Sequence, residues 1–460
     1  MTQPIKPYAH QLQSLKHNES TKRVFDCSDC GTGKTLVRIL GFAARRAAGG
    51  GALLVLAPRS LLRSVWVSDF QKSHPELVCS VADAANRETA FKAVADVYIT
   101  NHDATKWLST KKAPFFARFS ELVVDESTAY KHHTSFRSKA LAKIAKHFEY
   151  RCCMTGTPNG NSITDVWHQV FILDDGERLG KSFYAFRDSV CAPKQVGPNA
   201  NAMKWTDKEG AEEAVYGLLS DIVIRHKFED CVDIPPNHTY SVEYDLSPKQ
   251  LKAYAELEAT QMLTLQKQEI LAINAAAVAT KLLQVSSGAV YGSEGKHVAV
   301  DTTRYELVLD LVEQRQHSFV LFLWKHQRDA LVAEAQKRGV TYAVIDGDTS
   351  DADRQKLVEA YQAGRFQVIF GHPKTVAHGV TLTRGTATIW ASPTYDLELF
   401  AQGSKRQHRI GQTQKTETIV IVAKGTIEEK VWDILEGKNR RMRNLLDLFG
   451  TLNKEEACPA

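Results

Sequence analysis

The chain has 460 residues, of which 43% are hydrophobic, and its formal net charge is +5. That length is enough for about two or three domains with sizeable cores. No apolar run reaches the roughly 18 residues that span a bilayer, and no charged and apolar leader opens the sequence, so we expect a cytoplasmic protein without membrane association. The weak positive charge agrees with a nucleic-acid partner but does not establish one. The eight cysteines lack a second Cys-x-x-Cys pair that would complete a zinc site, so we expect reduced thiols.

A glycine-rich stretch, residues 28–35, follows the apolar pair Val24-Phe25 and precedes a helical pattern over residues 36–48. Strand, glycine-rich turn and helix in this order form a loop whose backbone N–H groups surround phosphates, while a lysine neutralises charge and a hydroxyl holds Mg²⁺. Gln11, in the segment before this strand, has the paired donor and acceptor that can read the edge of adenine. The sequence therefore predicts an ATP site, with Lys34 on the phosphates and Thr35 on Mg²⁺. The predicted binding residues are Gln11, Ser28, Gly31, Thr32, Gly33, Lys34 and Thr35.

Two further buried-strand patterns, residues 53–57 and 97–99, each end in polar side chains. Arg59 and Ser60 follow the first pattern, and Thr100 and Asn101 follow the second. Because the carboxyl ends of parallel strands form the binding edge of such a sheet, these four residues are candidate contacts for a ligand that runs across it. Solvated loops are the alternative that the sequence leaves open.

A third strand, residues 122–124, delivers the adjacent carboxylates of Asp125 and Glu126 to the same edge. Adjacent carboxylates at a buried edge are costly unless they have a role. Phosphoryl transfer requires a carboxylate for Mg²⁺ and a group that orients the attacking water, so we assign Asp125 to the metal and Glu126 to the water. The next strand, residues 151–154, leads into a tight turn, residues 155–159, which we expect to sense the state of both carboxylates.

The rest of the chain predicts an insertion, a linker and a second lobe. Irregular helical periodicity over residues 162–228, with a loop at residues 191–204, indicates an insertion packed on the first lobe. Residues 233–237 contain Pro-Pro, which fixes an extended path and stops a helix, so we expect a linker there. A helical stretch and a second parallel sheet follow. The expected helical stretch is 249–283 and the expected strands are 319–323, 342–345, 368–370, 388–390 and 419–422.

The second lobe has no phosphate loop but carries Arg406 and Arg409 within the stretch 402–412. Three residues apart, these side chains would share one face of a helix. Two guanidinium groups can reach a γ-phosphate bound by another lobe, and an arginine finger raises the hydrolysis rate by about 10³ to 10⁵. A solvated basic helix is the alternative interpretation. The later basic run, residues 438–443, is equally compatible with a solvated face and with contacts to a phosphate backbone.

Taken together, these motifs resemble those of the Swi/Snf-type helicase-like ATPases of helicase superfamily two. The matching stretches are Gln11, residues 28–35, 58–62 with Trp66, 100–101, 125–128, 155–159, 224–225 with 234–236, 346–349 with Arg354, 379–383 and 402–412. The resemblance implies an α/β fold of two tandem RecA-like lobes, each a mostly parallel sheet flanked by helices. Lobe 1 would span residues 1–232, the linker 233–237 and lobe 2 238–460. The resemblance also implies ATP and Mg²⁺ as cofactors and nucleic-acid contacts by Arg59, Ser60, Thr100, Asn101 and Thr381.

The same resemblance implies a motor that hydrolyses ATP and moves along double-stranded DNA, usually without separating the strands. A strand-separating helicase on DNA or RNA, with single-stranded DNA or RNA as partner, is one alternative, and an ATP-gated clamp without turnover is another. Motors of this type can work as monomers, and the compact chain resembles bacterial or phage members. Two departures stand out: Thr128 replaces the family's histidine, and one extra residue precedes Trp66.

Overall fold

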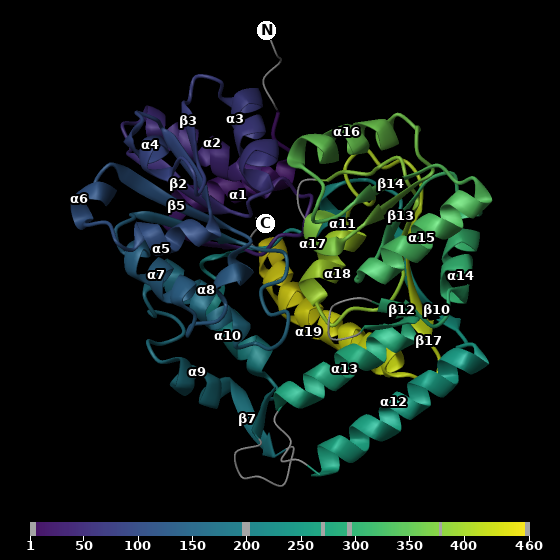
Figure 1. Cartoon of the computed structure of the whole chain (residues 1–460). Coiled ribbons are helices and arrows are strands. Elements are labelled where there is room, and N and C mark those ends of the chain that lie inside the picture. The colour runs from purple at the N-terminus through teal and green to yellow at the C-terminus, as the bar shows by residue number, and fades with distance from the viewer. Residues whose placement is uncertain (1–5, 196–202, 268–271, 292–296, 377–379, 456–460) are drawn as a thin grey trace. The chain divides into compact units, whose positions relative to one another are not determined.

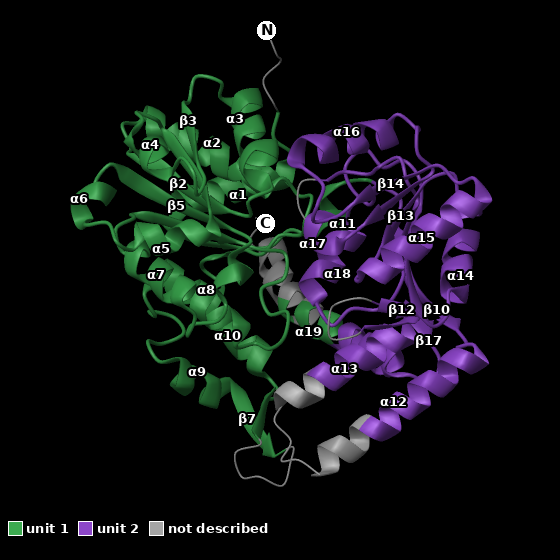
Figure 2. Ribbon diagram, viewed as in Figure 1, with its two compact units in different colours: residues 1–233, 438–460 green, residues 234–437 purple. Residues whose placement is uncertain are grey.

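The computed structural model describes residues 6–195, 203–267, 272–291, 297–376 and 380–455. Contacts divide the chain into two units, unit 1 with residues 1–233 and 438–460 and unit 2 with residues 234–437 (Figure 2). The tail therefore groups with unit 1, although the sequence analysis assigns it to lobe 2. Lys438 Nζ, for example, donates a hydrogen bond to Asn161 Oδ1 at 3.0 Å.

Unit 1 is built on a seven-stranded parallel sheet with the order β3-β4-β2-β5-β6-β1-β9 (Figure 1). β1, β5 and β6 are neighbours, so the loops that follow them lie side by side at one edge. All six residues of β2 are buried, as expected for a strand covered on both faces. The strands are β1 Arg23–Asp26, β2 Ala52–Ala57, β3 Cys79–Ala82, β4 Val97–Asn101, β5 Phe119–Asp125, β6 Tyr150–Met154 and β9 Val223–Ile224.

Helices cover this sheet, and α2 shows how the sequence directs one of them. It begins at Lys34 after the left-handed Gly33, and its buried side chains Ile39 and Phe42 join the core that contains residues of β2. Two arginines fill its last turn, where positive charge stabilises a helix. The α-helices of unit 1 that precede α19 are α1 Ala9–Ser20, α2 Lys34–Ala47, α3 Ser68–Ser73, α4 Arg87–Lys92, α5 Thr105–Leu108, α6 Ala113–Phe116, α7 Phe136–Ala145, α8 Asp165–Asp174, α9 Phe183–Val190, α10 Ala211–Leu219 and α11 Phe228–Cys231.

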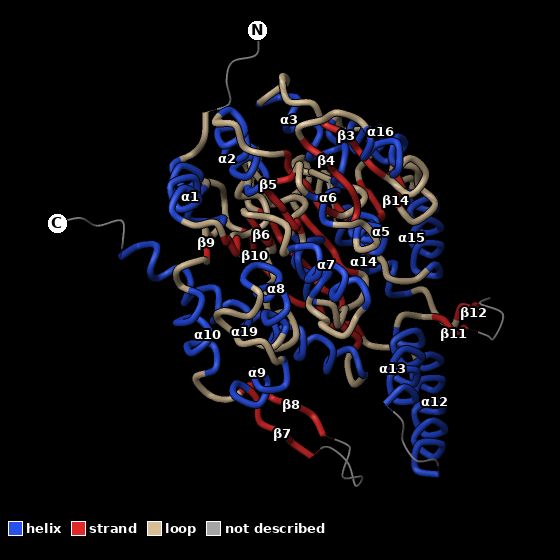
Figure 3. The backbone as a smooth tube through the Cα atoms, turned by 90° about the vertical axis from the view of Figure 1, so that its left-hand side faces the viewer, coloured by secondary structure: helices blue, strands red, loops and turns tan. Residues whose placement is uncertain are grey.

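The stretch predicted as a helical insertion, residues 162–228, is in part integral to unit 1. Helix α8 packs on β1 and β6 with nine of its ten residues buried, and β9 is the edge strand beside β1. β7 Cys191–Gln195 and β8 Met203–Asp207 form an antiparallel hairpin where the sequence predicts a loop (Figure 3). The hairpin corrects the predicted loop. The packing of α8 and the strand β9 were not predicted, because a helix buried on every side has no amphipathic period and β9 is only two residues long.

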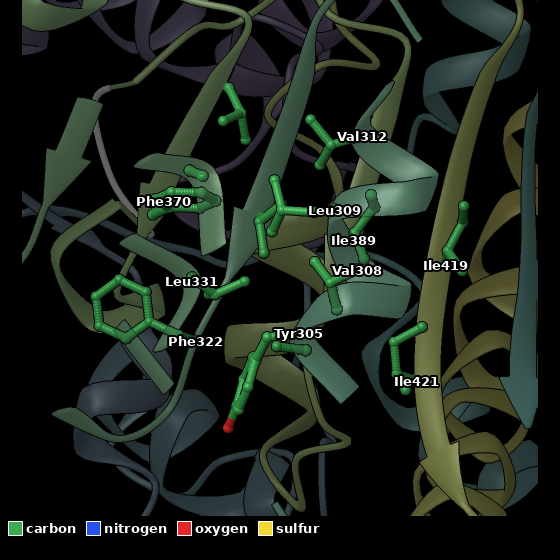
Figure 4. Close-up of a cluster of buried hydrophobic side chains, with 14 of the residues drawn as sticks. Tyr305, Val308, Leu309, Val312, Phe322, Leu331, Phe370, Ile389, Ile419 and Ile421 are labelled. Atoms are coloured by element: carbon green, nitrogen blue, oxygen red, sulfur yellow. The ribbon is translucent and has the colours of Figure 1, made fainter. Parts of the chain in front are cut away.

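Unit 2 holds a six-stranded parallel sheet with the order β10-β17-β16-β13-β15-β14. Five of its strands confirm the sequence-based prediction, while β10 was missed because most of its residues are exposed at the sheet edge. Side chains of β13, β15, β16 and β17 form a core with α14 Thr303–Glu313 and α15 Lys325–Arg338 (Figure 4). The strands are β10 Asn237–Tyr244, β13 Ser318–Leu321, β14 Tyr342–Ile345, β15 Val368–Gly371, β16 Ala387–Trp390 and β17 Thr416–Ala423.

Smaller elements complete unit 2. Helices α12 Pro248–Lys267 and α13 Ala272–Ser286 pack against each other, and β11 Ala289–Tyr291 pairs with β12 His297–Ala299. Within the described ranges, none of the helices combines the length and the apolar character needed to cross a bilayer. Both sheets are parallel and flanked by helices, which confirms the predicted α/β fold class. The remaining helices are α16 Asp351–Gln362, α17 Pro373–Val376, α18 Leu397–Ser404 and α19 Ile427–Glu455, whose last part belongs to unit 1.

Candidate functional site

The glycine-rich loop connects β1 to α2 in unit 1. Gly31 has φ 94° and Gly33 has φ 78°, a left-handed backbone that favours glycine. No side chain caps the start of α2, so its first N–H groups are oriented toward the loop and suit an anion. Lys34 Nζ donates to the backbone oxygens of Ser28 at 2.5 Å and Asp29 at 3.1 Å, which places the ammonium inside the loop.

Neighbouring acidic groups keep the Lys34 side chain positively charged. Burial by itself lowers the pKa of Lys34, but the nearby Cys30, Asp26, Glu126 and Asp125 raise it, and the net pKa is higher than the ordinary value. The ammonium therefore stays protonated at every physiological pH, as a group that neutralises phosphate requires.

Asp125 and Glu126 lie at the end of β5. Asp125 is buried, and its Oδ2 accepts a hydrogen bond from Trp66 Nε1 at 3.0 Å. Burial raises the pKa of Asp125, and the Trp66 hydrogen bond and the charge of Lys34 offset this only in part. Glu126 has φ 52° and ψ 58°, a left-handed conformation that is strained for a residue with a side chain. Strain of this kind concentrates at functional sites.

Trp66 was not among the predicted site residues, although the sequence shows an extra residue before it. Residues Leu62–Val67 form a π-helix, whose wider turn accommodates one more residue than an α-helix. The indole is fully buried and points its N–H at Asp125. The π-helix thus accommodates the extra residue that the sequence has before Trp66, and the indole still reaches the Asp125 carboxylate.

The turn that follows β6 forms a third side of the site. Thr155 N donates to Asp26 O at 3.0 Å, and Thr157 N donates to Thr155 Oγ1 at 3.0 Å. A Cβ atom on Gly156 would lie 3.3 Å from Cys30 Sγ and 3.8 Å from Ser28 O. The turn at residues 155–159 therefore packs directly against the phosphate loop.

A second support of the loop comes from residues 225–228, whose contact with the loop was not predicted from the sequence. Arg225 Nη1 donates to Asp29 Oδ1 at 2.7 Å and to Cys27 O at 3.2 Å. Phe228 N donates to Asp29 Oδ2 at 3.0 Å, and its ring would lie 3.0 Å from a Cβ on Gly31. Nothing in residue spacing connects position 225 to the loop, and the only local signal is the β-branched pair Val223-Ile224 before it.

The start of α1 also contacts the loop. Gln11 is buried, its Nε2 lies 3.2 Å from Thr32 O and 3.4 Å from Gly33 O, and its Oε1 accepts from Tyr8 N at 2.9 Å. His10 Nε2 lies 2.8 Å from Thr32 O. Gln11 is thus brought to the predicted site, and its role toward adenine stays a prediction.

The predicted nucleic-acid contacts differ in exposure. Arg59 is exposed, Ser60 and Asn101 are half-buried, and Thr381 in unit 2 is exposed. Thr100 is fully buried, and its hydroxyl donates to Ala82 O on β3 at 2.7 Å. This placement corrects the sequence-based expectation for Thr100, because the side chain points along the sheet rather than toward a ligand.

In unit 2, helix α18 ends at Ser404, so Arg406 and Arg409 lie beyond it and do not share a helix face. Arg406 is buried, with Nε 2.6 Å from Gln402 O and Nη1 3.5 Å from Val380 O. Arg409 is half-buried, and its Nη1 donates to Thr381 Oγ1 at 3.1 Å. The stretch 402–412 therefore packs on residues 380–383, while position 379 of the predicted motif lies outside the described residues.

Comparisons with known proteins agree with these motifs. The model of the SNF2-related domain matches residues 12–291, and that of the helicase conserved C-terminal domain matches residues 303–411. Protein p41 of Acyrthosiphon pisum secondary endosymbiont phage 1 is 28% identical over 96% of this chain and 97% of its own length. An uncharacterized ATP-dependent helicase of Mycoplasma pneumoniae is 24% identical over 88% of this chain, which spans 38% of that protein. The solved Sulfolobus solfataricus SWI2/SNF2 ATPase core in complex with dsDNA has 18% identity and a TM-score of 0.44, covering 99% of this chain and 97% of that one.

Proposed function

This chain belongs to the family of the SNF2-related domain, and we propose that it is a motor that couples ATP hydrolysis to movement along double-stranded DNA. The observation that carries the proposal is the proximity of Lys34, at the start of α2, to Asp125 and Glu126, which follow each other at the end of β5. The family and the helicase-type relative support ATP hydrolysis. The duplex substrate and the translocation are our inference.

The residues of unit 1 have separate roles in this proposal. Lys34 and the N–H groups at the start of α2 bind the phosphates of ATP. Glu126 orients a water whose oxygen attacks the γ-phosphorus, and it accepts the proton that the water loses. The bond from the γ-phosphorus to the bridging oxygen breaks, and that oxygen leaves with ADP.

A divalent cation fits this donor set. In the described part of the chain, no group of three or more His, Cys, Asp or Glu side chains is arranged to hold a metal by itself. Mg²⁺ commonly takes one or two protein oxygens and completes its shell with water and substrate phosphates, and Asp125 and Thr35 supply such oxygens. When bound, the ion neutralises charge on the transferred phosphoryl group. Its proximity would also favour the ionised form of Asp125.

The proposed DNA contacts follow the exposed candidates. Arg59 and Ser60 follow β2, and Asn101 is the last residue of β4, so these residues lie at the carboxyl edge of the unit 1 sheet. Thr381 lies beside Arg409 in unit 2. Charged and polar side chains at such positions suit a phosphate backbone, which binds without reading sequence.

The test is the steady-state ATPase rate of the full chain, alone and with linear duplex DNA, single-stranded DNA or RNA. Glu126→Gln serves as the blank, because it keeps the size of the side chain and removes the base. Strong stimulation by duplex DNA that disappears at high salt is the expected result. Stimulation by single strands or RNA alone would favour a strand-separating helicase, and no turnover above the blank would favour an ATP-gated clamp.

Translocation is measured separately by displacement of a triplex-forming strand from duplex DNA, which needs movement but no strand separation. Lys34→Ala is the control, because it should weaken nucleotide binding and stop displacement. Unwinding of a forked duplex at the same ATP concentration would contradict the proposal that the strands stay paired.

A further inference from the structure

Three buried polar groups connect the segment after the two carboxylates to the turn after β6. Ser127 Oγ donates to Gln169 Oε1 at 2.7 Å, and Gln169 Nε2 donates to Pro158 O at 2.9 Å. Ser127 and Gln169 are both fully buried. The bridge thus runs from the residue next to Glu126, through helix α8, to the turn at residues 155–159.

The orientation of the Gln169 amide is determined by its partners. Its Nε2 also donates to Asp165 O at 2.9 Å, so both N–H groups are used by carbonyl oxygens. An amide turned by 180° would point its oxygen at two other oxygens, and only the observed orientation offers an acceptor to Ser127. Because water is excluded, each of these groups depends on the others for its hydrogen bond.

The two segments that Gln169 connects both contact the reaction centre. Gly156, in the turn with Pro158, packs on Cys30 of the phosphate loop, and Glu126 stands next to Ser127 in a strained left-handed conformation. A strained backbone persists only where its surroundings hold it. The Ser127 hydrogen bond holds the chain immediately after this residue.

We propose that Gln169 is a positioning residue that fixes the Glu126 backbone relative to the phosphate loop, acting through Ser127 on one side and Pro158 on the other. This inference rests on the proposed role of Glu126 in orienting the attacking water. Gln169 is fully buried and its side chain binds protein groups at both ends, so we assign its effect to geometry.

The experiment compares Gln169→Leu, Ser127→Ala and the double variant in ATPase assays without DNA and with saturating duplex DNA. Leucine has a similar shape but no hydrogen-bonding groups. Displacement of a reacting group by about 1 Å costs up to about a hundredfold in rate, so we expect kcat to fall by about tenfold to a hundredfold. The KM for ATP should change less than twofold, because Lys34 and the loop are untouched. The double variant should be no slower than Gln169→Leu.

Gln250 in unit 2 provides a matched control. It is fully buried, its Nε2 donates to Val285 O at 2.8 Å and Ser286 O at 2.8 Å, and its Oε1 accepts from Tyr244 Oη at 2.6 Å. Gln250→Leu removes the same set of groups and should lower the Tm to a similar degree. Its kcat should stay within twofold of the parent.

The outcomes separate the two proposals. A folded, active parent whose kcat is unaffected by Gln169→Leu would overturn the positioning role, as would an equal loss of kcat in Gln250→Leu or a loss expressed mainly in KM. A parent that hydrolyses ATP without stimulation by duplex DNA would contradict the proposed DNA motor and leave the positioning test decisive. A parent with no turnover above Glu126→Gln would overturn both.

Discussion

Trp66 donates its indole N–H to Asp125 across 3.0 Å, and both side chains are buried. A hydrogen bond to a carboxylate favours the ionised form, whereas burial favours the neutral form. Burial is the larger effect here, and the pKa of Asp125 is raised in spite of Trp66 and Lys34. The Trp66 hydrogen bond therefore offsets part of the free energy that is needed to keep the buried Asp125 ionised.

Replacing Trp66 by phenylalanine should move the acidic limb of the ATPase pH profile to higher pH. Loss of the indole donor raises the pKa of Asp125 further, so the carboxylate becomes protonated at a higher pH and turnover is lost earlier on acidification. The measurement is kcat/KM for ATP between pH 5 and pH 8, because this ratio reports the pKa values of the free enzyme. Trp390→Phe is the control, because Trp390 is also fully buried and its Nε1 donates to Ser404 Oγ at 3.2 Å. An unchanged profile in Trp66→Phe would remove the indole from this role.

Asp125→Asn should raise the Tm at pH 7 while it abolishes turnover. The pKa of Asp125 is raised in the folded state, so the native protein holds the proton more tightly than the unfolded chain does. That contribution to stability is fully present below the unfolded pKa of about 3.9 and is lost as the pH rises through the folded pKa. Asparagine stays uncharged at every pH, so the variant does not lose this stability. Its gain in Tm over the parent should be largest at neutral pH and absent in acid.

Asp96→Asn is the contrasting control for this measurement. Burial raises the pKa of Asp96, but the Val78 N–H and the Arg46 guanidinium lower it more, and its net pKa is lowered. This carboxylate contributes stability above its unfolded pKa and loses it as the pH falls through the folded pKa. Asp96→Asn should therefore lower the Tm at pH 7, with an effect that fades in acid. The same sign for both variants would contradict the argument.

The sequence predicted those elements that a short run of neighbouring residues is enough to determine. The loop at residues 28–35, the Asp125-Glu126 pair and five strands of unit 2 each follow from short runs of buried and polar residues. Parallel topology then brings the ends of β1, β5 and β6 together without further information. This is why the central part of the candidate site could be assembled from the sequence.

The missed features depend on partners that are distant in the chain. Arg225 supports a loop almost 200 positions earlier, and Gln169 joins the segments that follow two different strands, so neither has a local signature. Helix α18 ends before Arg406, whose guanidinium lies against the Val380 carbonyl oxygen, 26 positions earlier in the chain. Successive side chains of a strand point to opposite faces of the sheet, and Thr100 lies on a buried face. A shift of one position along the strand changes which face a residue occupies.

Arg225→Ala should raise the KM for ATP about tenfold, because Asp29 and the Cys27 carbonyl lose the guanidinium that holds the phosphate loop. The free energy of unfolding should fall by about 2–3 kcal/mol. This is below the roughly 3–5 kcal/mol expected for a fully buried pair, because the Asp29 side chain keeps 21% exposure.

Arg151→Ala is the matched control for Arg225→Ala. Arg151 is also buried, and its Nη1 donates to Asp175 Oδ2 at 2.9 Å and to the carbonyl oxygens of Ile172 and Leu173. Its loss should destabilise unit 1 by a similar amount and leave the KM for ATP within twofold. If both variants raise KM equally, the effect of Arg225 comes from general destabilisation rather than from the loop.

Arg406→Ala should lose stability, whereas Arg409→Ala should lose DNA-stimulated turnover. Arg406 is 2% exposed and binds backbone oxygens, so its removal leaves those groups without a donor and should lower the Tm of the chain. Arg409 is half-buried, and its contact with Thr381 lies at the surface, so Arg409→Ala should keep the Tm of the parent. If Arg409 supplies positive charge to the γ-phosphate during turnover, its loss should lower the DNA-stimulated kcat by about 10³. The measurement is the ATPase rate with and without duplex DNA beside a thermal melt, and a stable Arg409→Ala protein that hydrolyses ATP like the parent would show that this arginine is not the finger.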